Sequence, residues 1–376
     1  MASRFSTAKG FLQDDVLSVI GDLFGAGAQP KNRHGKLWNV VNPWRSGARA
    51  RQMVVWLDGN RVGAWRDFVS GETGDVIDLV AFCRDGRVDH ESRMKALEWI
   101  EDRYNIRSMD PKEKTRAAKR QQERRKKLEV EAVAARKKSN DRARRMYYSA
   151  QESIAGTVAE TYLRSARGID LDAIKFPSHA LRFMPRAEYW MAAPKDANGK
   201  RLAKGPHFPA LISAMRNCNG ELQACHLTFL ARDGSGKAPL FEFGNGFSAK
   251  LMWPETAGSM ISLCHGETGL SLADAAAEHK SGLLAVTEGI EDGLTVASAR
   301  SELRISAAGS LSGLMGLFDH PAISGWLIFK DNDWGKPQAQ KQFDSAIIRL
   351  RGFGKPVEII AIPPDWGKDV NDAING

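Results

Sequence analysis

Cysteine is scarce in this 376-residue chain, which has four, and none of them forms a Cys-x-x-Cys pair. The chain shows no N-terminal signal pattern and no apolar run of about eighteen residues, the minimum for a membrane-spanning helix. These absences exclude a disulfide-stapled secreted scaffold and predict a reduced, cytoplasmic protein without a membrane segment. A Gly-x-x-x-x-Gly-Lys-Ser/Thr phosphate loop is also missing, so no fused helicase is expected.

The overall composition is that of a folded protein with a basic surface. Hydrophobic residues make up 43% and charged residues 26%, and the length allows two or three domains with cores of their own. The net charge is +9 although many acidic residues gather near the C-terminus. The positive charge must therefore be concentrated elsewhere, which favours a polyanionic partner; a surplus of this size could also serve solubility alone.

Much of the positive charge lies in one segment between residues 107 and 150. From 112 to 145 there are fifteen lysines and arginines, five acidic residues, and no proline or glycine. This composition predicts a helical, basic linker, which at about 1.5 Å per residue would span about 50 Å. It is either a solvated spacer or an arm that contacts phosphates.

Acidic residues follow three apolar strand-like runs in the last hundred residues. Glu288 comes after LLAVT, Asp331 and Asp333 come after ISGWLIFK, and Asp369 comes after VEIIA. Alternation of strands and helices predicts a parallel sheet, and acids at the strand ends would gather at its carboxyl edge. Oxygen ligands without cysteine or histidine select Mg²⁺ or Mn²⁺.

Three segments in this region resemble the Toprim domain of primases, topoisomerases and related nucleases. TEGIEDGL matches its first acidic motif, SAAGSLSGL its small turn after the second strand, and KDNDWG its Asp-x-Asp. The resemblance implies a Rossmann-like parallel sheet flanked by helices, in a chain that is α/β overall. It also implies catalytic roles for Glu288, Asp331 and Asp333, with metal ligands at Glu288, Asp292, Asp331, Asp333 and Asp369. The chain departs from the family at Asn371, where many relatives carry a second Asp, unless Asp372 substitutes.

Residues 151–282 resemble the segment that precedes Toprim in primases of phages, plasmids and prophages. SIAGTVAETYLRSARGI is a predicted capped helix ending at Gly168, and HFPALISAMRNCNGELQACHLTFL is a predicted hairpin with an Asn-Gly turn. The loop DGSGKAP follows this hairpin. The resemblance places basic residues opposite the metal site to bind nucleotide or template: Lys237 by position, and Arg232, His226 and Lys250 less directly. A plain surface loop is the alternative.

Residues 1–106 are predicted to form a small α+β domain with helices and a β-hairpin. Tryptophans interleaved with arginines are typical of single-stranded nucleic-acid surfaces, here Trp44, Arg45, Trp65 and Arg66, although such tryptophans can also be core residues. WRDFVSGETGDVIDLVAF resembles the end of the zinc-ribbon domain of bacterial primases. None of its four zinc ligands is present: the matching positions are Asn42, Arg45, Asp67 and Ser70. We therefore expect no zinc, and ordinary packing in its place.

The sequence thus predicts four parts: a zinc-ribbon-like domain without zinc ligands (1–106), a basic helical linker (107–150), the first part of a primase catalytic core (151–282) and a Toprim domain (283–376). The resemblance implies a DNA primase of a mobile element. It would copy single-stranded DNA into RNA primers from ribonucleoside triphosphates, with a separate replicative helicase as partner. A Toprim nuclease with metal-dependent activity and a non-catalytic single-stranded DNA-binding protein are the alternatives.

Overall fold

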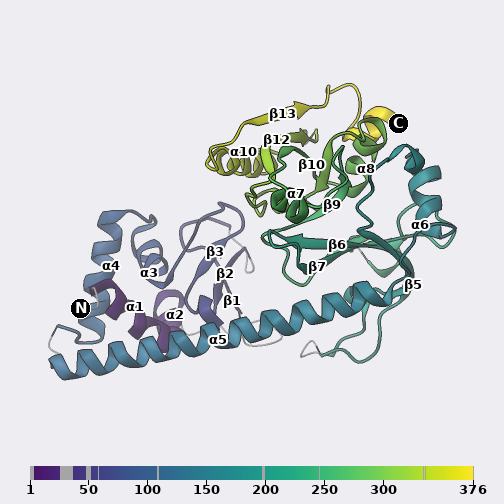
Figure 1. Ribbon diagram of the computed structural model, residues 1–376. Coiled ribbons are helices and arrows are strands. Elements are labelled where there is room, and N and C mark those ends of the chain that lie inside the picture. Colours follow the sequence, from purple (N-terminus) through teal and green to yellow (C-terminus); the bar gives the residue numbers. More distant parts are fainter. Residues whose placement is uncertain are drawn as a thin grey trace. The chain divides into compact units, whose positions relative to one another are not determined.

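The computed structural model describes residues 4–25, 37–47, 52–57, 59–107, 110–196, 200–244, 246–332, 334 and 336–375. The chain divides into two compact units (Figure 1). The first contains residues 1–135 together with 195–201, and the second contains residues 136–194 and 202–376. No helix in the described ranges has both the length and the apolar composition needed to cross a membrane.

Four helices of the first unit form one of its two hydrophobic cores: α1 (Arg4–Asp14), α2 (Val16–Phe24), α3 (Val76–Asp85) and α4 (His90–Arg103). A turn at Asp15 separates α1 from α2. The helices α3 and α4 follow each other in the chain. Each begins with a capping box, on Asp75 and Asp89 respectively, which satisfies backbone N–H groups that have no partner within the helix.

The second core of this unit lies between its helices and a four-stranded antiparallel sheet in the order β1-β2-β3-β4. The strands are β1 (Leu37–Val40), β2 (Met53–Trp56), β3 (Trp65–Asp67) and β4 (Thr73–Gly74). Val54 pairs with Arg66, which confirms the predicted hairpin. The sheet presents Trp38, Met53, Val55 and Trp65 to the core, so two of the tryptophans are packing residues.

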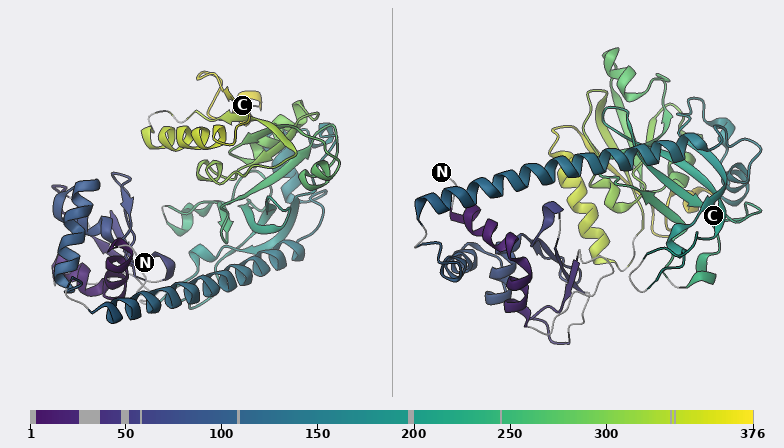
Figure 2. Two further views of the ribbon diagram at one scale, coloured as in Figure 1. Left: turned by 60° about the vertical axis from the view of Figure 1, so that its left-hand side comes forward. Right: turned by 90° about the horizontal axis from the view of Figure 1, so that it is seen from below.

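The basic segment is one long helix, α5 (Pro111–Ser149). Both views of Figure 2 show it without interruption. Its last turns belong to the second unit, where Ala143 and Tyr147 are buried in the core. Most of the other described side chains of α5 are exposed, as expected for a charged helix with little apolar surface. The predicted helix is confirmed, and its C-terminal end is also a core element.

The second unit is built on one nine-stranded sheet in the order β13-β12-β10-β11-β9-β6-β7-β8, with β5 paired to β6. Its strands are β5 (Leu181–Glu188), β6 (His207–Asn217), β7 (Leu222–Phe229), β8 (Lys250–Trp253), β9 (Ser259–His265), β10 (Gly282–Thr287), β11 (Arg304–Ala307), β12 (Ile323–Lys330) and β13 (Val357–Ala361). The predicted mixed α/β architecture is confirmed.

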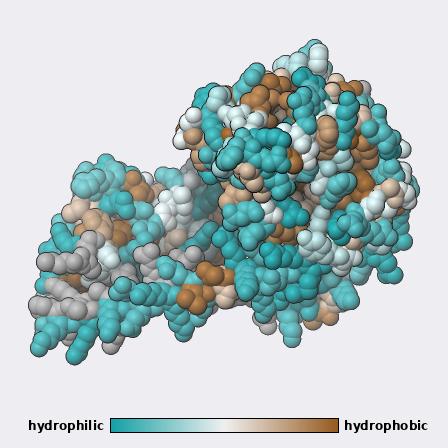
Figure 3. Space-filling view, in the orientation of Figure 1, coloured by the Kyte–Doolittle hydropathy of each residue, from teal (hydrophilic) through white to brown (hydrophobic). Residues whose placement is uncertain are grey.

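Strands β10 to β13 are parallel to one another, as the alternation of strands and helices predicted. Strand β10 sends Leu284 and Val286 to one face and Ala285 to the other. One face packs against α9 (Leu311–Leu314) and α10 (Pro337–Arg351), and the other packs against α8 (Ile290–Ala299). Helix α7 (Leu272–Ala277) precedes β10, and α11 (Val370–Asn375) ends the described chain. Figure 3 shows a mainly hydrophilic visible surface.

The antiparallel strands β5 to β9 continue the parallel part without a break. Strands β6 and β7 form the predicted Asn-Gly hairpin, with Ser213 opposite His226. Strand β9 pairs with β11 and also with β6, and so joins the two parts. The segments 151–282 and 283–376 therefore contribute strands to one sheet, although the expected ranges separate them.

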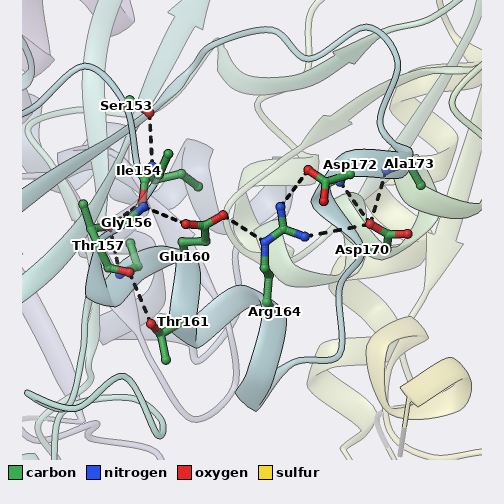
Figure 4. Close-up of polar contacts among 12 residues, drawn as sticks. Ser153, Ile154, Gly156, Thr157, Glu160, Thr161, Arg164, Asp170, Asp172 and Ala173 are labelled. Atoms are coloured by element: carbon green, nitrogen blue, oxygen red, sulfur yellow. Dashed lines mark hydrogen bonds and ion pairs between the residues drawn. The ribbon is translucent and has the colours of Figure 1, made fainter.

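The helix predicted to end at Gly168 begins later than its sequence suggests. It consists of α6 (Val158–Thr161), capped by Thr157, followed by a π-helical turn over Tyr162–Ala166. Arg164 donates to Glu160 at 2.9 Å and to Asp172 at 2.8 Å, which ties this turn to the loop that follows it (Figure 4). The turn brings Tyr162 into the interior of the unit.

Candidate active site

The carboxyl ends of β10 and β12 carry two of the predicted acids. Glu288 directly follows β10 and Asp331 directly follows β12, its parallel neighbour. Both side chains line one pocket, together with residues of α9 and α10. Between them in the chain, Ala308 directly follows β11, and its N–H donates to the Thr287 carbonyl at 2.9 Å. The structure thus brings Glu288 and Asp331 together, while Asp333 lies outside the described residues.

The Asp331 carboxylate is in an electrostatically unfavourable position. Burial raises its pKa to about 8, with further contributions from the charges of Asp292, Glu288 and Asp369. Its Oδ1 atom is buried and has no hydrogen-bond partner among the described residues. A buried carboxylate oxygen without a donor is costly unless a cation or a proton compensates it.

Asp292 lies on the first turn of α8, near the same edge. Burial, and next the charge of Asp369, raise its pKa to about 7, while the Asn371 backbone N–H donates to its Oδ1 at 3.1 Å. The Asn371 side chain donates to Thr295 Oγ1 at 2.9 Å and to the Arg167 carbonyl at 2.8 Å. The departure at Asn371 therefore has a structural role, because this amide ties α11 to α8.

The chemistry of these acids fits a hard divalent cation. All the donors are carboxylate oxygens, burial and the neighbouring carboxylates raise the pKa values of Asp292 and Asp331, and one oxygen of Asp331 has no partner in the described part of the chain. Within the same residues, no three Asp, Glu, His or Cys side chains are grouped closely enough to hold an ion. The ligand set predicted at Glu288, Asp292, Asp331, Asp333 and Asp369 remains a prediction.

Glu291, a buried acid that is not among the predicted site residues, lies beside Asp292. Lys250 Nζ is 2.9 Å from its Oε2, Lys237 Nζ is 3.4 Å from its Oε1, and the Tyr162 hydroxyl donates to Oε1 at 2.8 Å. Burial alone would raise the pKa of Glu291, but the two lysines hold it below its usual range. Arg167 Nε donates to the Tyr162 hydroxyl at 3.0 Å and extends the cluster.

The sequence offered one signal for this acid. Helix α8 is buried on both faces, with apolar residues at Ile290, Leu294, Val296 and Ala297 around the Glu-Asp pair. An acid inside such a helix requires a cationic or hydrogen-bonding partner. The identity of the partners could not be derived from the sequence, because Tyr162 lies 129 positions away and reaches Glu291 only through the fold.

The four basic residues expected near the acids have different surroundings. Lys237 and Lys250 are paired with Glu291, so neither is an isolated surface charge. Arg232 is exposed on the loop after β7. The prediction that His226 is a charged contact is wrong, because its side chain is buried in β7. Burial, followed by the charge of Lys250, lowers the pKa of His226 to about 4. A neutral, enclosed imidazole cannot neutralise a phosphate.

Some residues of the first unit that were predicted to bind nucleic acid are exposed, and others are buried. The prediction that Trp65 stacks on nucleic-acid bases is wrong, because its side chain is fully buried and stacks on Phe82 with ring centroids 4.6 Å apart. Trp44 is 56% exposed, although its Nε1 donates to the Phe82 carbonyl at 2.6 Å. Arg66 is exposed and lies over the ring of Phe68.

The four residues at the positions of the zinc ligands, Asn42, Arg45, Asp67 and Ser70, meet in a polar network. The buried Asp67 carboxylate accepts from Asn42 Nδ2 at 2.7 Å, from the Ser70 backbone N–H at 3.2 Å, and from the Arg45 guanidinium. Burial alone would raise the pKa of Asp67, but its hydrogen bonds, led by that from Asn42, lower it. The expectation of ordinary packing at these positions is therefore wrong, because a charge-assisted network occupies them.

Comparisons with known proteins give one family model and several solved structures. The model of a domain of unknown function, DUF7146, matches residues 137–263, about a third of the chain. A DNA primase domain from Pseudomonas aeruginosa is 17% identical, with a TM-score of 0.39, over 62% of this chain and 73% of that one. The Escherichia coli primase catalytic core is 16% identical, with a TM-score of 0.39, over 62% and 75%.

A DnaG primase catalytic domain bound to single-stranded DNA is 15% identical, with a TM-score of 0.37, over 62% of this chain and 73% of that one. No curated protein matches the chain in sequence. Because the description of the matching family names no activity, the function has to be argued from the site itself.

Proposed function

We propose that this chain is a DNA primase, which synthesises short RNA primers on single-stranded DNA by metal-assisted nucleotidyl transfer. The observation that carries the proposal is the contact of Lys237 and Lys250 with Glu291, next to Asp292. It joins the basic residues of the segment that resembles primase cores to the acidic edge of the parallel sheet. A nuclease built on the acids alone would leave this basic segment without a role.

In this proposal the acidic edge holds the reacting groups. Glu288, Asp292, Asp331 and Asp369 would offer oxygen ligands to Mg²⁺ or Mn²⁺, and Asp333 would add another. Divalent ions bound there would supply activation of the attacking 3′-hydroxyl and stabilisation of the leaving pyrophosphate. The raised pKa of Asp331 makes it a proton-binding group until a cation lowers that pKa.

The basic residues would neutralise the triphosphate or the template. Lys250 and Lys237 lie on the strand and loop that flank Glu291, so an incoming phosphate would compete with a carboxylate already in place. This competition favours polyanions over singly charged ligands, because several charges are needed to displace a buried pair. Arg232 is exposed on the same loop and would extend the phosphate contact.

The proposal also covers the type of domain, the genetic element that the enzyme serves, its location and its partner. We infer that residues 283–376 are a Toprim domain, that the enzyme serves a mobile element and acts in the cytoplasm, and that a separate helicase opens its template. The motifs quoted for Toprim and for primases of phages and plasmids support the first two points, and the missing phosphate-loop motif supports a separate helicase. Ribonucleoside triphosphates would be the second substrate.

Primer synthesis tests the proposal directly. Purified protein is incubated with single-stranded DNA of mixed sequence, labelled ribonucleotides and Mg²⁺ or Mn²⁺, beside Asp331→Ala and Glu288→Gln. A matched control is Glu278→Gln, which removes an exposed carboxylate paired with Lys280. We expect short RNA products from the wild type and the control, and a loss of at least a hundredfold in both site variants, as is typical for electrostatic contributions at active sites.

The other outcomes identify the alternatives. Metal-dependent shortening of the DNA without RNA synthesis would replace the primase with a nuclease. DNA binding with neither activity, also in the presence of a replicative helicase, would leave a non-catalytic binding protein.

A further inference from the structure

Two exposed tryptophans flank the acidic edge of the second unit. Trp334 follows Asp331 by three positions and Trp366 precedes Asp369 by three positions, and each stands in an Asp-Trp-Gly tripeptide. Their side chains are 57% and 59% exposed. Other tryptophans of this unit are packed against rings, as Trp326 is against Phe353 and Trp190 against Trp253. Exposing two indoles costs hydrophobic free energy, which a ligand could recover.

The loops that carry the two indoles are joined to each other. β12 and β13 are parallel neighbours, and Lys330 pairs with Ala361 where both strands end. Beyond that point, the Asn332 backbone N–H donates to the Lys368 carbonyl at 2.7 Å, and its side chain donates to the Gly367 carbonyl at 2.9 Å. These bonds join the residue two positions before Trp334 to the two residues that follow Trp366.

The second loop is also anchored to the helix that follows it. The φ angle of Gly367 is 128°, and a Cβ atom there would lie 2.8 Å from Asp372 Cβ on α11. Only glycine fits this position without strain. The Trp366 backbone N–H donates to the Pro363 carbonyl at 3.0 Å. The turn from Pro363 and the close approach of Gly367 to α11 therefore fix the backbone on both sides of the exposed Trp366.

We propose that Trp334 and Trp366 form a base-stacking site for a single strand of nucleic acid. Indole rings stack on any base, and two rings on adjacent loops suit successive bases of a strand better than the single base of a free nucleotide. The side chain of Lys368, on the same loop, is exposed and supplies positive charge for the strand's phosphates. The site rests on the proposed function for its position beside the acids, and it predicts binding that does not require catalysis.

The test separates stacking from phosphate binding. Fluorescence anisotropy measures the affinity of the full chain for a labelled oligothymidylate and for an abasic oligonucleotide of the same length, in EDTA. We expect Trp334→Ala and Trp366→Ala each to weaken oligothymidylate binding about tenfold and to leave abasic binding unchanged. Phenylalanine at either position should restore most of the affinity. Ile348→Ala, which removes an exposed side chain from α10, is the control and should change neither.

Three results would overturn the stacking site. The first is unchanged oligothymidylate binding in the double variant, and the second is an equal loss of abasic binding. The third is a loss of affinity confined to ATP, measured as a competitor, which would assign the indoles to a free nucleotide. If the wild type makes no primers but binds bases through these indoles, the primase proposal fails and the stacking site stands.

Discussion

Replacing Glu291 by glutamine should destabilise the second unit, because the substitution leaves two lysines without their counter-charge. Lys250 and Lys237 lie 2.9 Å and 3.4 Å from its carboxylate oxygens, and the lysine side chains are 32% and 31% exposed. Breaking a buried pair by removing one partner costs about 3–5 kcal/mol. Since both lysines keep some contact with water, we expect about 2–3 kcal/mol.

The loss of stability in the Glu291→Gln variant should depend on pH in a definite direction. The pKa of Glu291 is lower in the folded chain than in the unfolded one, so its stabilising contribution is complete above the unfolded value of about 4.3 and declines as the pH falls. The difference between wild type and variant should therefore be largest at pH 7. It should be smaller by about 1 kcal/mol at pH 3.5, because the Glu291 carboxyl stays ionised there in the folded chain while it is largely protonated in the unfolded one.

Urea denaturation of the full chain at both pH values measures this difference, and hydrogen exchange of peptides from α8 assigns it to the second unit. Glu278→Gln is the matched control and should stay within about 0.5 kcal/mol of wild type. Adding Lys250→Met to Glu291→Gln should recover part of the loss, because it removes one of the uncompensated charges. A variant as stable as wild type at pH 7, or a loss that does not depend on pH, would refute the reasoning.

Two further predictions concern Asp331, whose pKa is raised by the fold, and Asp67, whose pKa is lowered. The pKa of Asp331 is raised, so its ionisation opposes folding above the unfolded value of about 3.9, and Asp331→Asn should stabilise the metal-free chain by about 2 kcal/mol at pH 8 but not at pH 4. Thermal melts should show Mg²⁺ stabilising wild type more than this variant; equal shifts would contradict the metal site. Asp67→Asn should cost the first unit about 3 kcal/mol, because the Arg45 charge loses its buried partner. EDTA should leave the wild-type melt of this unit unchanged, whereas a fall would indicate a metal in place of the network.

Several features of this protein were determined by sequence alone, because local chemistry is enough to specify them. Apolar strands that end in acids predicted the parallel sheet and brought Glu288 and Asp331 to one edge. An uninterrupted charged segment predicted α5, and Asn219-Gly220 predicted the hairpin of β6 and β7. Strand alternation, helix propensity and turn preference act over a few residues, so these patterns survive without knowledge of the partners.

Only the tertiary structure decided which side chains meet. Trp44 and Trp65 have similar sequence surroundings, yet Trp44 lies in a turn after β1 and is 56% exposed, whereas Trp65 lies on β3 and faces the core. Asp67 finds Asn42 across 25 positions and Glu291 finds Tyr162 across 129. Such pairings depend on contacts distant in sequence, and a charge acquires its pKa and its stability contribution only once the fold has enclosed it and supplied its partners.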